Sequence, residues 1–437
     1  MGTRYYCIVI LTILAVLVAA PLYSYADAPA KVDTGDTAFV LVSAALVMLM
    51  TPGLALFYGG MVRGKNVLGT IMQSFIAIAL ISVQWILFGY SLAFGPDIHG
   101  VIGSLDWAGL CGVGAAPNPD YAPTVPHLAF MIYQAMFAVI TPALITGAVA
   151  ERMKFSAYLL FTLLWSTIVY DPIAHWMWGT GGWLKNLGAL DFAGGVVVHV
   201  SSGISALAAA LLIGKREGFP DHPFYPHNLP MTVLGAGLLW FGWFGFNAGS
   251  ALASGVLSTW AFVATHTSAV TATLIWVIIE WVHRGKPTMF GAATGSIAGL
   301  ATVTPASGFV SPMGALIIGL AAGSVCYVAL NMKTKFGYDD SLDAFGVHGI
   351  GGMLGTLATG LFAQTLINPA GADGLFFGNP KLLATQCIAV GVSAVYSFVL
   401  TIVLFKIIDI VVGLRIDDDE ERKGLDISQH GERGYTS

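Results

Sequence analysis

The chain has 437 residues, of which 56% are hydrophobic and only 10% are charged. An ordinary soluble domain carries about 25% charged residues, so this chain has too few to cover the surface of a soluble fold of its length. The net charge of −5 and the lack of a basic arm imply no nucleic-acid partner, and the spacing of the four cysteines fits neither a metal site nor a redox pair. Composition therefore predicts an all-α, polytopic membrane protein.

The N-terminal segment has the features of a secretory signal peptide. One basic residue, Arg4, precedes an apolar run of roughly 14 residues that leads to the small-x-small sequence ending at Ala26. We expect residues 1–26 to be removed, leaving a membrane domain at 27–412 and a tail at 413–437. The alternative is an uncleaved membrane helix, for which the run is short, since a bilayer requires about 20 residues.

Eleven apolar segments of spanning length follow. Their approximate limits are 37–58, 67–94, 127–149, 155–178, 191–213, 229–249, 258–282, 288–306, 313–332, 345–366 and 381–412. Several contain Gly or Pro, which membrane helices tolerate. Residues 95–126, which are rich in Pro, Gly and Asp, are expected to form a long loop between the second and third spans.

The basic residues predict the orientation of these spans. All 19 Lys and Arg residues except Arg4, Lys31, Lys185 and Lys381 lie in alternate loops or toward the C-terminal tail. The positive-inside rule then places the tail in the cytoplasm and the mature N-terminus outside. An odd number of spans gives the same arrangement.

Two histidines lie inside long apolar stretches, His199 in VVHVSSG and His348 in GVHGIGG. Ionisable residues within a membrane usually face a protein interior or a pore and mark an ion or proton pathway. Eleven spans can divide into an inverted 5+5 repeat plus a last helix, and such repeats place their binding site near the midplane. The two histidines then fall on equivalent fifth helices, and a pseudo-two-fold axis would bring their rings together. The alternative is two unrelated histidines, each in an ordinary interhelical hydrogen bond.

Other polar and aromatic residues are less specific. Asp191 begins the fifth span, roughly 12 Å before the histidine of that span, where it would cap the helix or attract a cation. Aromatic residues near the outer ends of spans are typical of an interfacial belt. Tyr133 and Phe137 nevertheless share one helical face, and with Trp178 and Ser250 they would frame a vestibule for a small cation.

From about residue 36 to the C-terminus the sequence resembles the ammonium transporter (Amt/Mep/Rh) family, on the bacterial Amt side. The blocks that carry the resemblance are TPGLALFYGGMVRGKNVL, ITPALITGAVAERMKFSAYL, DFAGGVVVHVSSG, GKREGFPDHPFYPHNLPM, WFGWFGFNAGSA, DAFGVHGIGGMLGTLATG and VGLRIDDDEERKGLDISQHGERGY. Such blocks are far more specific than shared hydropathy.

The resemblance implies the roles of individual residues. It implies an ammonium-binding vestibule, a phenylalanine gate, twin pore histidines and an essential acidic residue. In this chain the vestibule residues are Trp178, Phe137, Ser250 and Tyr133, the gate is Phe137 with Phe246, the histidines are His199 and His348, and the acidic residue is Asp191. Tyr133 stands where a Phe is common, and His266 stands where family members often carry a neutral polar residue. His266 has no counterpart in the other half, so we expect its ring either to form a hydrogen bond with a neighbouring residue or to lie at a channel end.

The physical chemistry of ammonium suggests a mechanism. Ammonium donates four hydrogen bonds and can lose a proton, whereas potassium of similar size can do neither. An apolar lumen penalises a charge by at least about 2.5–3.5 kcal/mol, which neutral ammonia avoids. We therefore expect deprotonation in the vestibule, ammonia conduction through the pore, and a proton relay by the two imidazoles, so that uptake is electrogenic. A passive ammonia channel and an ammonium sensor are the alternatives.

An enzyme is not expected, because two histidines without a carboxylate pair, a nucleophile motif or a third ligand make poor hydrolytic or metal machinery. No cofactor and no metal are expected. The resemblance also implies a homotrimer in the inner membrane, each subunit with its own pore. It further implies that the C-terminal tail is docked and meets a PII-type signalling protein from the cytoplasm, whereas the charge pattern alone would fit a disordered tail.

Overall fold

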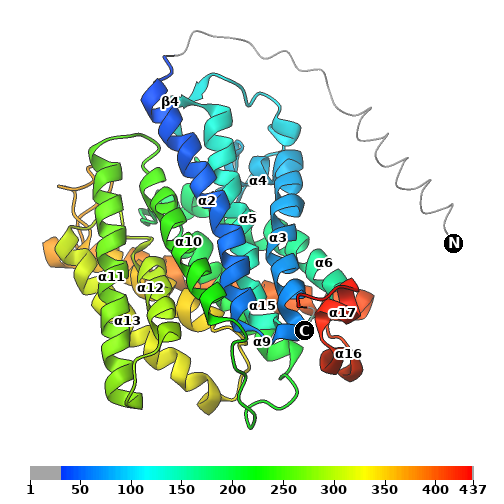
Figure 1. Cartoon of the computed structure of the whole chain (residues 1–437). Coiled ribbons are helices and arrows are strands. Elements are labelled where there is room, and N and C mark those ends of the chain that lie inside the picture. Colours follow the sequence, from blue (N-terminus) through cyan, green and yellow to red (C-terminus); the bar gives the residue numbers. More distant parts are fainter. Residues whose placement is uncertain (1–30, 436–437) are drawn as a thin grey trace, which may run out of the picture.

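The computed structural model describes residues 31–435, so the predicted signal peptide, residues 1–26, lies outside the described residues. Within the described range, ten helical segments are long and apolar enough to cross a membrane. One further predicted span, residues 288–306, is a shorter apolar helix, Met289–Val303. The chain is thus an all-helical, multi-pass membrane protein, and each predicted span corresponds to a helical segment (Figure 1).

The crossing segments form two sets of five, followed by a last helix. The first set is α2 (Thr34–Met61); α3 (Val67–Gln84) with η2 (Trp85–Gly89) and α4 (Tyr90–Phe94); α5 (His127–Val149); α6 (Phe155–Trp165) with η4 (Ser166–Tyr170) and α7 (Asp171–Trp178); and η5 (Gly195–Val200) with α9 (Ser201–Ile213). The second set is α10 (Leu229–Gly249), α11 (Val256–Arg284), α12 (Met289–Val303), α13 (Pro312–Phe336), and η6 (Phe345–Gly349) with α14 (Ile350–Phe362). The last helix is α15 (Pro380–Val412), which ends where the tail was predicted to begin.

Short elements lie at the two ends of the bundle. The segment predicted as a loop, 95–126, contains two small antiparallel ladders: β1 (Asp97–Ile98) pairs with β2 (Ile102–Gly103), and β3 (Pro117–Asn118) pairs with β4 (Ala122–Pro126). In register, Asp97 lies opposite Gly103 and Asn118 lies opposite Ala122. The remaining short helices are η1 (Gly64–Asn66), η3 (Ala108–Leu110), α8 (Trp183–Leu187), η7 (Leu375–Phe377), α16 (Asp418–Lys423) and α17 (Leu425–His430).

We name the ends of the bundle by these elements. The end that carries β1–β4 and α8 is the loop face, where Figure 1 labels β4, and the end that carries α16 and α17 is the tail face. Helix α2 begins at the loop face, where the Asp33 N–H donates to the Thr124 carbonyl (2.8 Å), and ends beside η1, which contacts α17. Helix α10 runs the opposite way, because the Asn228 N–H before it donates to the Gly60 carbonyl at the tail face (3.1 Å).

The packing of the helices follows the predicted division into two inverted halves. The first helices of the two sets, α2 and α10, pack against each other, and they are antiparallel. The fifth segments cross at the centre, where η5 contacts η6 and α14, and α9 contacts η6. Helix α5 packs against α2, α3 and α9 and is buried along almost its whole length. The centre of the molecule therefore lies where the two fifth segments meet.

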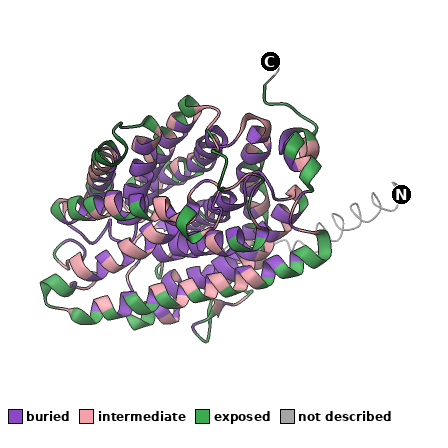
Figure 2. Ribbon diagram, turned by 90° about the horizontal axis from the view of Figure 1, so that it is seen from below, coloured by how far each residue is buried: buried purple, intermediate pink, exposed green. Residues whose placement is uncertain are grey.

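The outside of the bundle is apolar where it would meet lipid. Exposed residues lie along the outward sides of the helices, while the residues of the inner sides are buried (Figure 2). On α15 the exposed residues Val395, Val399, Val403 and Ile407 recur every four positions and form one stripe. Such a stripe in water would be an aggregation hazard, but facing lipid it satisfies the hydrophobic requirement of the membrane.

Candidate functional site

The helix that carries the first histidine begins at a capping carboxylate. Asp191 Oδ1 accepts hydrogen bonds from the N–H groups of Gly194 (2.8 Å) and Gly195 (2.6 Å), and its Oδ2 accepts from Val196 (2.8 Å) and Val197 (3.1 Å). A helix N-terminus leaves four N–H groups without intrahelical partners, and negative charge is favoured there by the helix dipole. The carboxylate of Asp191 is thus engaged by the backbone that it caps.

The helix that carries the second histidine begins in the same way. Asp340 Oδ1 accepts from the Ala344 N–H (3.1 Å) and its Oδ2 from the Phe345 N–H (2.8 Å). Asp340 precedes its histidine by eight residues, which is also the spacing in the first half. Sequence reasoning missed Asp340, although the equal spacing in two inverted halves was a usable signal.

The two predicted pore histidines meet at the centre of the bundle. The Nδ1 atoms of His199 and His348 are 3.3 Å apart, the ring centroids are 5.2 Å apart, and the ring planes differ by 20°. Both side chains are buried, and both lie in π-helical turns, η5 and η6. When both rings are neutral, one Nδ1 donates and the other accepts. Among the described residues His199 Nε2 has no partner, so this nitrogen is available to a molecule in the cavity that both rings line.

Glycines allow the two helices to cross this closely. Gly203 follows His199 by four residues, and Gly352 follows His348 by four. A Cβ atom on Gly203 would overlap the backbone of Gly349, and one on Gly352 would lie 2.8 Å from the His199 Cβ. Small residues at a membrane helix crossing let backbones approach, and here they bring the imidazoles into contact.

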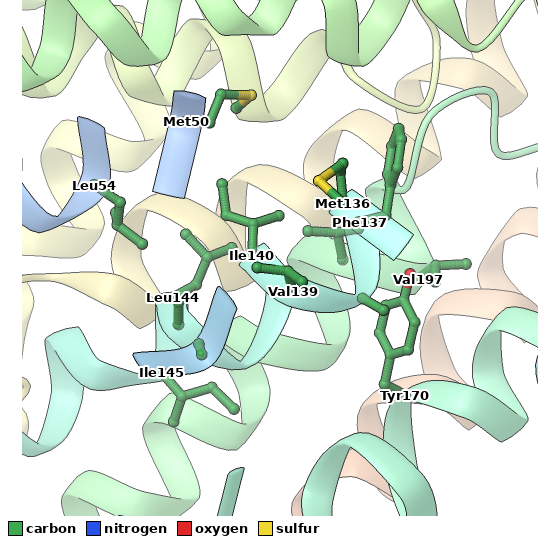
Figure 3. Close-up of a cluster of buried hydrophobic side chains, with 14 of the residues drawn as sticks. Met50, Leu54, Met136, Phe137, Val139, Ile140, Leu144, Ile145, Tyr170 and Val197 are labelled. Atoms are coloured by element: carbon green, nitrogen blue, oxygen red, sulfur yellow. The ribbon is translucent and has the colours of Figure 1, made fainter. Parts of the chain in front are cut away.

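The cavity beside the histidines is narrow and apolar. Its walls come from α2, through Met50 and Leu54, and from α5, through Ile140 and Leu144, and these side chains belong to the buried cluster drawn in Figure 3. Its volume of about 10 Å³ is close to the space that one water molecule needs. A cavity of this size and polarity is suited to a small neutral molecule.

Two phenylalanines separate this cavity from a wider one toward the loop face. The ring centroids of Phe137 and Phe246 are 4.3 Å apart, with planes 34° apart. Phe246 also stacks with the His199 ring at 6.1 Å, and Trp243 stacks with the same ring at 5.6 Å. Trp243 was not singled out from the sequence; its indole N–H donates to Thr304 Oγ1 (2.9 Å), which fixes the ring that supports the histidine.

The wider cavity contains most of the predicted vestibule residues. Its volume is about 190 Å³, and Phe137, Trp178 and Ser250 are among its lining residues. The Phe137 and Trp178 rings meet edge to face at 5.9 Å, so they form two walls of a corner. The Trp178 indole N–H donates to the Asp191 carbonyl (2.9 Å), which couples the vestibule wall to the helix cap.

Tyr133 lies behind this wall and does not line the cavity. Its ring is fully buried against Phe137, with centroids 5.0 Å apart. Its hydroxyl lies within hydrogen-bond distance of the Gly245 (3.0 Å) and Phe246 (2.9 Å) carbonyls and of Ser250 Oγ (3.2 Å). The hydroxyl that distinguishes Tyr from the common Phe therefore anchors the end of α10 and the serine.

The vestibule also has lining residues that sequence reasoning did not identify as a site. Gln134, which is buried, follows Tyr133 directly, and its Oε1 has no partner among the described residues. Asp120 and Lys185 lie at the rim and are the charged side chains that the described part of the chain contributes to this cavity. One lies in a loop and the other in α8, far apart in the sequence, so no motif or regular spacing indicates that they share a cavity.

The third histidine noted in the sequence lies outside both cavities. His266 is exposed on α11, where its ring is 5.6 Å from the Trp240 ring and 6.2 Å from the Phe244 ring. It lines neither cavity.

The tail face contains a buried cluster of ion pairs. Glu151 pairs with Arg63 (2.9 Å) and with Arg216 (2.9 Å), and Arg216 also pairs with Asp339 (2.7 Å). Burial alone would raise the pKa of Glu151, but the charges of Arg216 and Arg63 lower it to about 2. Asp339 behaves similarly: burial opposes ionisation, yet the hydrogen bonds and charge of Arg216 lower its pKa to about 2. These groups hold together loops from both halves of the chain.

The C-terminal tail is docked on this cluster. Lys65 Nζ donates to the carbonyls of Glu421 (2.7 Å) and Arg422 (2.8 Å), and Asp426 Oδ1 accepts from the Gly69 N–H (2.8 Å). Asn66 joins the two systems, because its Nδ2 donates to Glu151 and its Oδ1 accepts from the N–H of Leu425. The tail is ordered by specific contacts, and the interpretation as a disordered tail does not fit residues 413–435.

Known proteins have sequences similar to that of this chain. A family model described as Ammonium Transporter Family matches residues 38–435. The ammonium transporter of Bacillus subtilis is 54% identical over 402 residues, which cover 92% of this chain and 98% of that protein. The ammonium transporter Amt1 of Archaeoglobus fulgidus is 52% identical over 402 residues, covering 92% and 99% of the two chains.

Solved structures share the fold. The crystal structure of Saccharomyces cerevisiae Mep2 aligns with a TM-score of 0.84 and 35% identity over 89% of each chain. The structure of a protein named Sensor Amt Protein aligns with a TM-score of 0.84 and 31% identity over 91% of this chain and 98% of that chain.

Proposed function

Because the chain belongs to the ammonium transporter family and ammonium transport is its function, we propose that it takes up ammonium by separating the ion into ammonia and a proton. The observation that carries this proposal is the contact between His199 and His348 beside an apolar cavity. The steps run from the loop face to the tail face. The protein is a transporter and not an enzyme.

Recruitment takes place in the vestibule. The faces of Trp178 and Phe137 attract a small cation through their π-electrons, and the lone pairs of Ser250 Oγ accept an N–H from it. Ser250 can act in this way because its own proton is directed to the Phe246 carbonyl (2.9 Å). Tyr133 supports this serine from behind and is not itself a wall of the binding site. The helix end capped by Asp191 is held beside the same indole.

Deprotonation occurs between the vestibule and the narrow cavity. The Phe137 and Phe246 rings form a gate, and beyond it the walls are aliphatic. A bare cation would lose its hydration there at a cost of at least about 2.5–3.5 kcal/mol, whereas ammonia carries no net charge. Potassium has no proton to lose and is rejected at this point.

The two imidazoles relay the proton. Each neutral ring offers one donor and one acceptor, so a proton taken at one end of the pair is matched by a proton released at the other. The Nδ1 contact of 3.3 Å supplies the link between the rings. Ammonia and the proton both cross, so each transport cycle moves one positive charge.

Current measurements test this function. In proteoliposomes, an ammonium gradient should elicit charge movement that potassium does not. His199→Asp and His348→Asp each put a carboxylate in the pore, so we expect ammonium selectivity to fall and potassium current to rise. Full ammonium selectivity in both variants would contradict the proton relay.

Two further observations distinguish the alternatives. Ammonia flux without current would indicate a passive ammonia channel. A deletion strain that takes up methylammonium normally but fails to regulate nitrogen genes would indicate a sensor, the property for which one structural neighbour, Sensor Amt Protein, is named.

We further propose the setting of the molecule. The signal peptide is cleaved after Ala26, the loop face lies outside the inner membrane, and the tail face lies in the cytoplasm, as the distribution of basic residues supports. The protein is a homotrimer, and a PII-type signalling protein binds at the tail face, where α16 and α17 are docked. N-terminal sequencing, cross-linking in membranes and co-purification with the regulator test these three statements.

A further inference from the structure

The vestibule carries an ammonium group of its own. Lys185 Nζ lies 5.9 Å from the centroid of the Tyr121 ring, in the position of a cation on an aromatic face. The same atom donates a hydrogen bond to the backbone carbonyl of Trp178 (3.1 Å), a residue of the vestibule wall. A primary alkylammonium head is thus held at the entrance of a site built for the simplest ammonium ion.

The opposite charge lies on the same rim. Asp120 lines the cavity together with Lys185, and the two are the charged side chains that the described residues place around it. They are too far apart to form an ion pair within 4 Å in the described structure. Asp120 is close enough to act electrostatically on Lys185, but because no ion pair joins them, both charges also act on the vestibule.

We propose that Lys185 is a resident cation that sets the apparent affinity of the vestibule for ammonium, with Asp120 acting in the opposite sense. This inference rests on the proposed function. The Lys185 charge repels the incoming ion and competes for the same electron-rich surfaces, so it holds the half-saturating ammonium concentration above the value that the aromatic wall alone would give. The carboxylate of Asp120 lowers that concentration.

Coulomb's law gives the size of the effect. For a cation on the order of 10 Å from Nζ, repulsion changes the binding constant about twofold in a water-like dielectric and about tenfold or more in the lower dielectric of a protein surface. The Debye length falls from about 10 Å at 0.1 M salt to about 3 Å at 1 M. An effect of this origin must therefore fade as sodium chloride is added.

The test uses the full-length protein in proteoliposomes and measures the half-saturating ammonium concentration of the current. We expect Lys185→Met to lower this concentration by about twofold to tenfold at low salt. Lys185→Arg keeps the charge and should keep the wild-type value, whereas Asp120→Asn should raise the concentration. The shifts in Lys185→Met and Asp120→Asn should shrink in 1 M sodium chloride.

A matched control removes a charge elsewhere on the same face. Lys381 lies in the first turn of α15, is exposed and lines neither cavity, so Lys381→Met should leave the half-saturating concentration unchanged. If Lys185 merely held the Trp178 carbonyl, Lys185→Met would raise the concentration, and the change would not depend on salt. That result, or no change, would overturn the proposal. A wild-type protein without ammonium current would instead contradict the proposed function and this inference with it.

Discussion

Adding one methyl group at Gly352 should separate the two pore histidines. A Cβ atom there would lie 2.8 Å from the His199 Cβ, 2.9 Å from the Gly195 carbonyl oxygen and 2.9 Å from the Val200 nitrogen. Ordinary contacts of a Cβ begin at 3.4 Å, so the helices must move apart by about 0.6 Å to restore normal van der Waals separation. Overpacking of this kind costs about 1–3 kcal/mol.

The displacement acts directly on the imidazole pair. Adding it to the observed Nδ1–Nδ1 separation of 3.3 Å gives about 3.9 Å, which is beyond hydrogen-bond distance. If the rings relay the proton, Gly352→Ala should lower the ammonium-dependent current by at least about tenfold, which corresponds to about 1.4 kcal/mol in the barrier. The current is measured in proteoliposomes at matched protein density, and thermal melting in detergent reports the stability.

Gly237 supplies the control. It also lies in a membrane-crossing helix, but a Cβ there would meet nothing within 4 Å. Gly237→Ala should therefore leave the current unchanged and should not lower the melting temperature, because alanine is a better helix former than glycine. Wild-type current in Gly352→Ala, or an equal loss of current in Gly237→Ala, would refute the reasoning.

Further predictions concern stability. Asp191→Asn removes the negative charge of a carboxylate that accepts hydrogen bonds from four backbone N–H groups. We expect the free energy of unfolding, followed by thermal melting, to fall by about 1.5–3 kcal/mol. The exposed Asp106→Asn should show no such loss. Arg216→Met leaves Glu151 and Asp339 without a shared partner and should cost about 3–5 kcal/mol, with Arg216→Lys failing to restore stability because the fork geometry is lost. Both carboxyls have pKa values lowered to about 2 in the folded protein, so their ion pairs stabilise the fold fully above the unfolded pKa of about 4. That stability should be lost as the pH falls from about 4 toward 2, and in Arg216→Met melting curves this acid-dependent loss should be reduced; an unchanged pH profile would contradict the assignment.

Much of the fold follows from hydropathy. Eleven spans were predictable because a bilayer sets the length of an apolar helix, and the inverted halves followed from the odd number of spans in each. Helix α12 is shorter than the predicted span 288–306. Its end at Val303 could not be foreseen, because the sequence stays apolar beyond that residue. The ladders β1–β4 were missed because strands of two to five residues leave no periodic pattern.

The candidate site was predictable to the extent that its parts lie on helices of known direction. His199 and His348 were placed together from topology alone, and the structure brings them into contact. Asp120 and Lys185 could not be assigned to the site from the sequence. One lies in a loop and the other in a five-residue helix, and the sequence does not determine where such elements point. Tyr133 shares a helical face with Phe137, as expected. Only Phe137 lines the cavity, because α10 packs against Tyr133, and the position of α10 could not be read from the sequence.

The opposed caps at Asp191 and Asp340 have an electrical consequence. Each stands at the positive end of a helix, one near the loop face and one near the tail face, and the two helices run toward each other until they cross at the imidazoles. Their macrodipoles therefore point in opposite directions along the pore and largely cancel. These two helices therefore contribute little net field along the line that joins the loop face to the tail face.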